Sequence, residues 1–264
     1  MVSFTKLFTA GLVATSAMAA PMHAKRSSGK RGAAYNDVST VSALANAGTI
    51  SWAYNWAGDL SGSLPSGVEF VPMLWGQNMF GGWATAIQTA LSSGSTYILG
   101  FNEPDMTSQA NMSPSDAASY YQTYITPWSG QAKLISPAVT SSTTAGMGLD
   151  WFESFIGSCT SCGITGLAVH WYGDTADDFK SFVTQAASAA SSNNLSELWI
   201  TEFALNADVN GSADPAATAA FLNEVIPWLD QQSAVTRYSY FMCAENYLLS
   251  GSTLNLAGKA YVSS

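Results

Sequence analysis

The chain has 264 residues, of which 47% are hydrophobic and 10% are charged, and its net charge is -9. This length can bury a large core and suits one α/β barrel or two small domains. The acidic balance repels nucleic acid and anionic membranes, which excludes both as partners and leaves neutral or cationic ligands. Nine Trp and eleven Tyr offer flat rings that could stack on sugars, although most such rings belong to protein cores.

The first 19 residues have the pattern of a secretory signal peptide. Lys6 gives a positive start, a short apolar stretch follows, and Ala17-Met18-Ala19 is a small-residue cleavage site. The apolar stretch is too short to span a bilayer. We therefore expect a secreted, soluble protein, located outside the cell or in the cell wall, and a monomer.

Residues 20–31 are predicted to be a short leader. They contain dibasic pairs at Lys25-Arg26 and Lys30-Arg31, and either pair could be a processing site. The second pair could instead simply lead into the first strand. The predicted folded domain spans residues 32–264.

Short apolar strands and helical patterns alternate through this domain. The strands are continuous apolar runs, as expected of buried parallel strands. Helical patterns begin after Asp37, Ser113 and Asp214, cover 83–91, 149–156 and 176–190, and include Pro227, which should kink the last helix. The strand candidates are 32–35, 50–54, 70–74, 97–101, 133–136, 166–171, 198–201 and 235–242. Eight strands predict a single-domain (β/α)8 barrel, with an open doubly wound sheet as the alternative.

Chemistry in such a barrel belongs at the carboxyl ends of the strands. Glu103 follows the fourth strand, Glu202 follows the seventh, and Glu245 comes a few residues after the eighth. Glu69 and Glu197 precede strands, so they should fall at the opposite end, where side chains serve stability. Strands four and seven oppose each other in an eight-stranded ring, so Glu103 and Glu202 can converge over its centre.

Two carboxylates across one pocket are what glycoside cleavage requires. One acts as an acid towards the departing oxygen, and the other attacks the anomeric carbon or activates water. Asn102 could hydrogen-bond a sugar hydroxyl beside the reacting carbon, and Pro104 fixes the loop. Asn-Glu-Pro-Asp alone could be only a turn, but the second acid in "WITEF" favours the catalytic interpretation.

Side chains at other strand ends are candidate substrate-binding groups. His170 or Tyr172 could hydrogen-bond Glu202 and keep it ionised. The further candidates are Asn55, Trp56, Trp75 and Trp171, with weaker cases for Gln77, Asn78 and Asn246. The aromatic candidates could equally be core residues.

The three cysteines have different expected roles. Cys159 and Cys162 lie in a Gly/Ser-rich loop and could form a disulfide, a redox pair or half of a zinc site. Without a second such pair, and with His170 the only histidine after the leader, a structural disulfide is favoured and no metal or cofactor is expected. Cys243 is predicted to be a buried thiol. Candidate glycan acceptors are Asn111, Asn194 and Asn210.

The order of the motifs resembles glycoside hydrolase family 128, especially its fungal secreted members with the glycosyl hydrolase catalytic core. The motifs are "KRGAAYN", "GFNEPD", "SPAV", "WFESFIG", "LAVHWYG", "LWITEFAL" and "GKAY", and they cover nearly the whole chain after Lys30. The resemblance implies a (β/α)8 barrel, a retaining mechanism and a β-1,3-glucan substrate. It also implies that Glu103 is the acid/base and Glu202 the nucleophile.

The sequence therefore predicts a secreted hydrolase of β-1,3-glucan that uses double displacement and acts in the endo mode, although some family members act in the exo mode. Two other functions stay open at this point. One is a glucan-binding wall protein with little turnover, and the other is a barrel glycosidase for another β-glycan such as cellulose or mannan.

Overall fold

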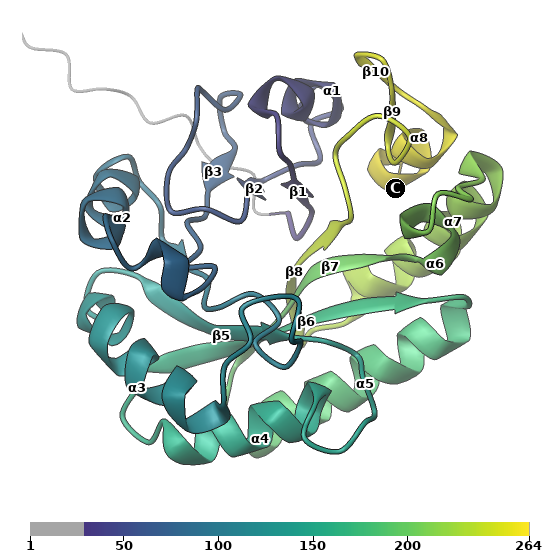
Figure 1. Cartoon of the computed structure of the whole chain (residues 1–264). Helices are drawn as coiled ribbons and strands as arrows, with labels where there is room; N and C mark the ends of the chain where they lie inside the picture. The colour runs from purple at the N-terminus through teal and green to yellow at the C-terminus, as the bar shows by residue number, and fades with distance from the viewer. Residues whose placement is uncertain (1–28, 264) are drawn as a thin grey trace, which may run out of the picture.

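The computed structural model describes residues 29–263 and shows a curled sheet of parallel strands with helices around its outer face (Figure 1). The predicted signal peptide and the Lys25-Arg26 pair lie outside the described residues. No helix within residues 29–263 combines the length and apolarity needed to cross a bilayer.

All eight predicted strands are present and pair in parallel. One set comprises β1 (Gly32–Ala34), β2 (Trp52–Tyr54) and β3 (Glu69–Phe70). The other comprises β4 (Tyr97–Ile98), β5 (Lys133–Val139), β6 (Ile164–Gly173), β7 (Glu197–Leu205) and β8 (Val235–Tyr240). Isolated parallel bridges join the two sets, from Met73 to Leu99 and from Arg31 to Tyr238. The chain is thus an α/β fold built on a curled parallel sheet.

The predicted helices are present, and those after Ser113 and Asp214 start at their predicted caps. The Ser113 and Thr175 hydroxyls and the Asp214 carboxylate accept backbone N–H groups of the first helical turn. The helices are α1 (Val41–Ala45), α2 (Trp83–Ser92), α3 (Pro114–Tyr124), α4 (Gly148–Ser158), α5 (Ala176–Ser192) and α7 (Pro215–Gln231), with 3-10 turns η1 (Val38–Thr40), η2 (Gln77–Met79) and η3 (Thr126–Trp128). Pro227 lies inside α7, which continues to Gln231.

Besides the 3-10 turn η2, four short elements were not predicted: α6 (Asn206–Val209), the hairpin of β9 (Leu249–Ser250) and β10 (Thr253–Leu254), and α8 (Leu256–Val262). Residues 55–68, between β2 and β3, contain no helix. An ideal alternation would place a helix after every strand, and no helix lies between β2 and β3.

Two apolar layers form the core, one on each face of the sheet. Trp52, Tyr54 and Trp199 belong to the cluster on the inner face, together with small and aliphatic side chains of neighbouring strands. Phe152 and Phe179 belong to the larger cluster between strands and helices. Because both faces are buried, the strands read as continuous apolar runs.

A network of charged and aromatic side chains lies at the amino ends of the strands. The Arg237 guanidinium donates to Glu69 at 2.7 Å and covers the rings of Tyr97 and Trp199, with distances to the centroids of 4.4 and 4.8 Å. Glu197 is buried there and accepts from Lys133 at 2.6 Å. The prediction that Glu69 and Glu197 lie away from the chemistry is confirmed.

Lys30 and Arg31 are part of the fold, so the ordered domain begins before residue 32. The Lys30 ammonium donates to the carbonyl oxygens of Leu229, Asp230 and Gln232 at the C-terminus of α7, at 2.7 to 3.2 Å. Arg31 is buried and donates to the Tyr238 hydroxyl at 2.8 Å, to the Tyr261 carbonyl at 3.0 Å and to Asp230 at 2.8 Å.

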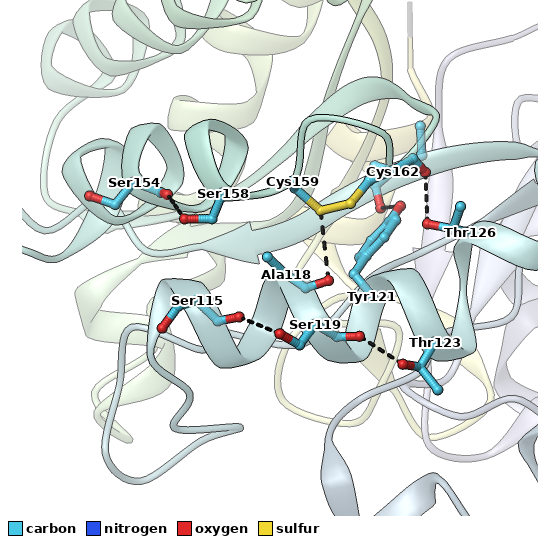
Figure 2. The surroundings of a disulfide bond; sticks show 11 residues. Ser115, Ala118, Ser119, Tyr121, Thr123, Thr126, Ser154, Ser158, Cys159 and Cys162 are labelled. Atoms are coloured by element: carbon cyan, nitrogen blue, oxygen red, sulfur yellow. Dashed lines mark hydrogen bonds between the residues drawn. A yellow bond between two sulfur atoms is a disulfide. The ribbon is translucent and has the colours of Figure 1, made fainter.

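The predicted disulfide between Cys159 and Cys162 is present. It closes the turn after α4 and lies against α3, where one sulfur is 4.0 Å from the Ala118 carbonyl oxygen (Figure 2). The Thr126 hydroxyl donates to the Cys162 carbonyl at 3.0 Å. The disulfide therefore closes the turn before β6, and the Thr126 hydrogen bond attaches this turn to the α3–η3 segment. Cys243 is free and buried, as predicted.

Candidate active site

A cleft of about 840 Å³ opens at the carboxyl ends of the strands. Every strand of the curled sheet contributes a lining residue, either from its own end or from the segment just after it. In strand order, these include Asn36, Trp56, Trp75, Glu103, Thr140, Tyr172, Glu202 and Phe241. The cleft thus lies at the edge where the sequence places the chemistry.

Glu103 and Glu202 meet in this cleft. Both are buried, with 6% and 5% of their surfaces exposed, and both line it. One carboxylate oxygen of each, together with a ring nitrogen of His170, lies within 4.8 Å of the others. Two acids 99 residues apart in the chain therefore share one pocket.

Two aromatic side chains hold Glu202 in place. The Trp56 indole N–H donates to Glu202 Oε1 at 2.7 Å, and the Tyr172 hydroxyl donates to Oε2. Because an indole N–H can only donate, Oε1 must act as an acceptor. Burial, followed by the nearby Glu202 charge, raises the pKa of Tyr172 well above its usual value, so its hydroxyl keeps its proton. Glu202 is presented to the cleft as a fixed acceptor.

His170 lies beneath the two acids and is fully buried. Its Nδ1 is 2.8 Å from Glu103 Oε1 and 3.4 Å from Glu202 Oε2, and its Nε2 is 2.9 Å from the Thr201 hydroxyl. Burial acts to lower the pKa of His170, but the charges of Glu202 and Glu103 outweigh it and raise the pKa above 6.5. An imidazolium here would compensate for part of the paired negative charge.

Backbone pairing aims Glu103 and Glu202 at the cleft. The Glu103 N–H donates to the Ala138 carbonyl at 2.8 Å, and the Asn102 N–H donates to the Trp75 carbonyl at 2.9 Å. On the other side, a register shift after Val169 sets His170 directly opposite Glu202 in the β6–β7 pair. Such irregularities re-aim side chains near sites.

Asn102 lines the cleft and has an unsatisfied hydrogen-bond acceptor. It is buried, its Nδ2 donates to Gln109 Oε1 at 3.3 Å, and its Oδ1 has no hydrogen-bond partner. A buried acceptor without a donor is costly unless a ligand supplies one. A sugar hydroxyl would do so.

Other predicted binding residues divide into two groups. Trp75 lines the cleft, as do Trp56 and Tyr172. The prediction that Trp171 binds substrate is wrong: it is buried on the opposite face of β6, with its ring stacked on Phe221 at 5.9 Å. Alternation along a strand sends neighbouring side chains to opposite faces.

Asn55 is also not among the cleft-lining residues. Its amide donates to the Asp59 carbonyl at 3.0 Å and its Oδ1 accepts from the Ala57 N–H, so it stabilises a local turn. Gln77 and Asn78 are exposed on η2. Glu245 and Asn246 lie in a separate groove beside the β9–β10 hairpin.

Several lining residues were missed from the sequence. They come from strand ends and the segments after them, where no motif marks which side chain turns inward, and comprise Asn36, Met106, Gln109, Thr140, Ser141, Ser142, Met147, Val209, Phe241 and Tyr247. Only their position after a strand end could have indicated them.

Glu103, His170 and Glu202 also form the one group, among the described residues, whose atoms could hold a metal ion. In the arrangement present, His170 Nδ1 faces Glu103, and both Glu202 oxygens accept from Trp56 and Tyr172.

The three candidate glycan acceptors, Asn111, Asn194 and Asn210, are exposed on the surface.

Comparisons with known proteins agree with this geometry. Residues 32–261 match the model of the family described as glycosyl hydrolase catalytic core. The chain is 31% identical over 254 residues to alkali-sensitive linkage protein 1 of Schizosaccharomyces pombe, with 89% of this chain and 45% of that protein covered. It therefore spans about half the length of this curated relative.

Solved structures are similar over nearly the whole domain. A glycoside hydrolase family 128 (subgroup III) curdlan-specific exo-β-1,3-glucanase from Blastomyces gilchristii, in complex with glucose, is 41% identical with a TM-score of 0.83. A subgroup II endo-β-1,3-glucanase from Sorangium cellulosum is 27% identical with a TM-score of 0.75. A subgroup I endo-β-1,3-glucanase from Amycolatopsis mediterranei, in complex with laminaripentaose, is 28% identical with a TM-score of 0.73. Each comparison covers 89% of this chain and 98% of the other.

Proposed function

The chain belongs to the glycosyl hydrolase catalytic core family and to glycoside hydrolase family 128, and on this premise we propose that it hydrolyses β-1,3-glucan. The observation that carries the proposal is the convergence of Glu103 and Glu202, whose oxygens lie within 4.8 Å of each other in the cleft. The similar structures act on this class of glucan or hold its oligosaccharides.

Glu103 is the proposed acid/base and Glu202 the proposed nucleophile. In the first step, Glu103 gives a proton to the departing glycosidic oxygen while a Glu202 oxygen attacks the anomeric carbon. In the second step, Glu103 takes a proton from water, which displaces Glu202 and releases the sugar with its original configuration. Trp56 and Tyr172 hold the attacking carboxylate in position, and Asn102 Oδ1 accepts from a sugar hydroxyl.

The separation of the acids supports this retaining course. Retaining enzymes keep their two carboxyl groups about 5 Å apart, whereas inverting enzymes separate them by about 6.5–9.5 Å to admit water. Proton NMR of fresh laminari-oligosaccharide products tests the proposal, because retention gives the β-anomer first. Initial α-anomer would contradict double displacement.

We also propose that the curled sheet is a (β/α)8 barrel and that the protein is a secreted monomer. Hydrogen bonds on both seams support closure, from Leu99 N–H to the Pro72 carbonyl at 2.9 Å and from Tyr238 N–H to the Lys30 carbonyl at 2.9 Å. The sequence of the first 19 residues supports secretion.

The assignment of the nucleophile is tested by Glu202→Gln. Hydrolysis of laminarin should fall by about four orders of magnitude or more, because the attacking oxygen is lost, while folding and glucan binding persist. Glu245→Gln is the matched control, since Glu245 also follows a strand but lies outside the cleft. A Glu202→Gln variant with near-normal activity would refute the assignment.

The mode of cleavage follows from the products of laminarin, sized over time. Both endo- and exo-acting enzymes occur among the similar structures, so the endo mode stays a prediction. A mixture of intermediate oligosaccharides at early times is the expected result. A single small product from the start would contradict the endo mode, and a polysaccharide panel would separate β-1,3-glucan from other β-glycans.

A further inference from the structure

Asp105, the last residue of the Asn-Glu-Pro-Asp motif, has no part in the proposed chemistry, yet it is well bonded. Its carboxylate accepts from the Thr140 hydroxyl at 2.5 Å, the Thr140 N–H at 3.2 Å and the Gly148 N–H at 2.8 Å. The donors lie at the two ends of the segment between β5 and α4: Thr140 is its first residue and Gly148 is the first residue of α4. Hydrogen bonds to an ionised carboxylate are stronger than those between neutral groups.

The bonded segment forms one wall of the cleft. Thr140, Ser141, Ser142 and Met147 line it, and residues 140–147 contain no helix or strand. A segment without regular structure needs side-chain bonds to hold one shape. Asp105 supplies them at both ends, at Thr140 and at Gly148.

Gly148 shows how tightly the segment is folded. Its φ is +55°, and a Cβ at this position would collide with the Ser142 carbonyl oxygen. Glycine therefore lets the segment turn back on itself while its N–H reaches Asp105.

We propose that Asp105 is a positioning residue that fixes the 140–147 wall against the loop carrying Glu103, and so sets the affinity for the glucan chain. This inference rests on the proposed function, because it concerns binding of the same substrate. In the part of the chain that the structure describes, Asp105 forms no hydrogen bond with Glu103 or Glu202 and bonds instead to Thr140 and Gly148. Its loss should weaken substrate binding and leave the chemical step intact.

Kinetics of Asp105→Asn on laminarin, with thermal unfolding measured in parallel, test the proposal. An asparagine is neutral and places an NH2 group where Asp105 Oδ1 now lies 3.3 Å from the Thr140 N–H, so KM should rise about tenfold while kcat changes less than about threefold. Asp178→Asn is the matched control: Asp178 accepts from the Thr175 hydroxyl at 2.7 Å on the exposed start of α5. Its KM should equal that of the unmodified chain.

A second pair of variants tests the wall without changing a charge. Gly148→Ala should raise KM in the same way, because the added Cβ meets backbone that cannot yield. Gly48→Ala is its control, since Gly48 is not among the residues that line the cleft and also has a positive φ (+77°), but has open space around its Cβ position. It adds strain without a collision.

The outcomes separate this inference from the proposed function. If the unmodified chain does not hydrolyse laminarin, the proposed function fails. If it does, an unchanged KM in Asp105→Asn or in Gly148→Ala overturns the positioning role. A fall in kcat at constant KM also overturns it, because Asp105 would then act on the chemical step rather than on binding.

Discussion

Two residues at the centre of the site have unusual backbone conformations. Glu103 has φ +42° and Trp56 has φ +57°, both in the left-handed region that residues with a Cβ rarely adopt. Such positions cost about 1–3 kcal/mol each and persist where the surroundings over-determine them. For Glu103 the surroundings include its backbone bond to Ala138. The strain places both side chains in the cleft rather than along their strands.

The pKa of His170 gives a prediction at the same scale. In a chain without the leader it is the only histidine, so its imidazole titration can be followed by NMR without assignment. The pKa should lie above 6.5, since Glu202 and Glu103 outweigh burial, and Glu202→Gln should lower it. A value below 6.5 in the unmodified chain would contradict this account.

The raised pKa of His170 also determines how its contribution to the free energy of unfolding changes with pH. A folded-state pKa above the unfolded value means that protonation stabilises the fold. The contribution of His170 is fully present below pH 6.5 and is lost as pH rises through the folded-state pKa. The difference in free energy of unfolding between the unmodified chain and His170→Gln should therefore narrow as the pH is raised from 6 through the folded-state pKa of His170.

At the scale of elements, the sequence revealed the strands and the two acids but not which face each strand residue takes. Glu103 and Glu202 could be found because a carboxylate directly after an apolar run is chemically conspicuous. Trp171 and Tyr172 could not be separated, because a strand buried on both faces has no polar alternation to set its phase. The β9–β10 hairpin and α8 are short and depend on tertiary contacts, so no local sequence pattern predicted them.

The start of the folded domain yields a prediction at this scale. A chain beginning at Gly32 loses the Lys30 bonds to the last carbonyls of α7 and the buried Arg31 bonds to Tyr238 and Asp230. Compared with a chain beginning at Gly29, its free energy of unfolding should fall by about 3 kcal/mol in urea titrations. Equal stability of the two chains would show that processing after Arg31 is tolerated.

In the whole molecule, the carboxyl ends of the strands form the candidate active site, and the amino ends carry interactions that stabilise the fold. The carboxyl ends carry the cleft, and the amino ends carry the network of Arg237, Glu69, Lys133 and Glu197. The Arg237–Glu69 ion pair of this network is largely buried, and such a pair is costly to break from one side.

Arg237→Met tests this division. Removing the guanidinium leaves Glu69 buried with only part of its partners, so the free energy of unfolding should fall by about 3 kcal/mol. The kcat on laminarin, measured well below the unfolding midpoint, should not change. Lys180→Met is the control, because Lys180 pairs with the exposed Glu224, and should cost less than about 1 kcal/mol. A loss of kcat in Arg237→Met would mean that the two ends are coupled.

The lysine and arginine side chains of residues 29–263 lie outside the cleft lining. Of the six within residues 29–263, five hold structure through the bonds described for Lys30, Arg31, Lys133, Lys180 and Arg237. The cleft lining contains two glutamates and neither lysine nor arginine. A polyuronate or a sulfated glycan would meet negative charge there that His170 compensates only in part, and the repulsion would be strongest in dilute buffer. Discrimination against anionic polymers is thus built into the cleft by electrostatics rather than by shape.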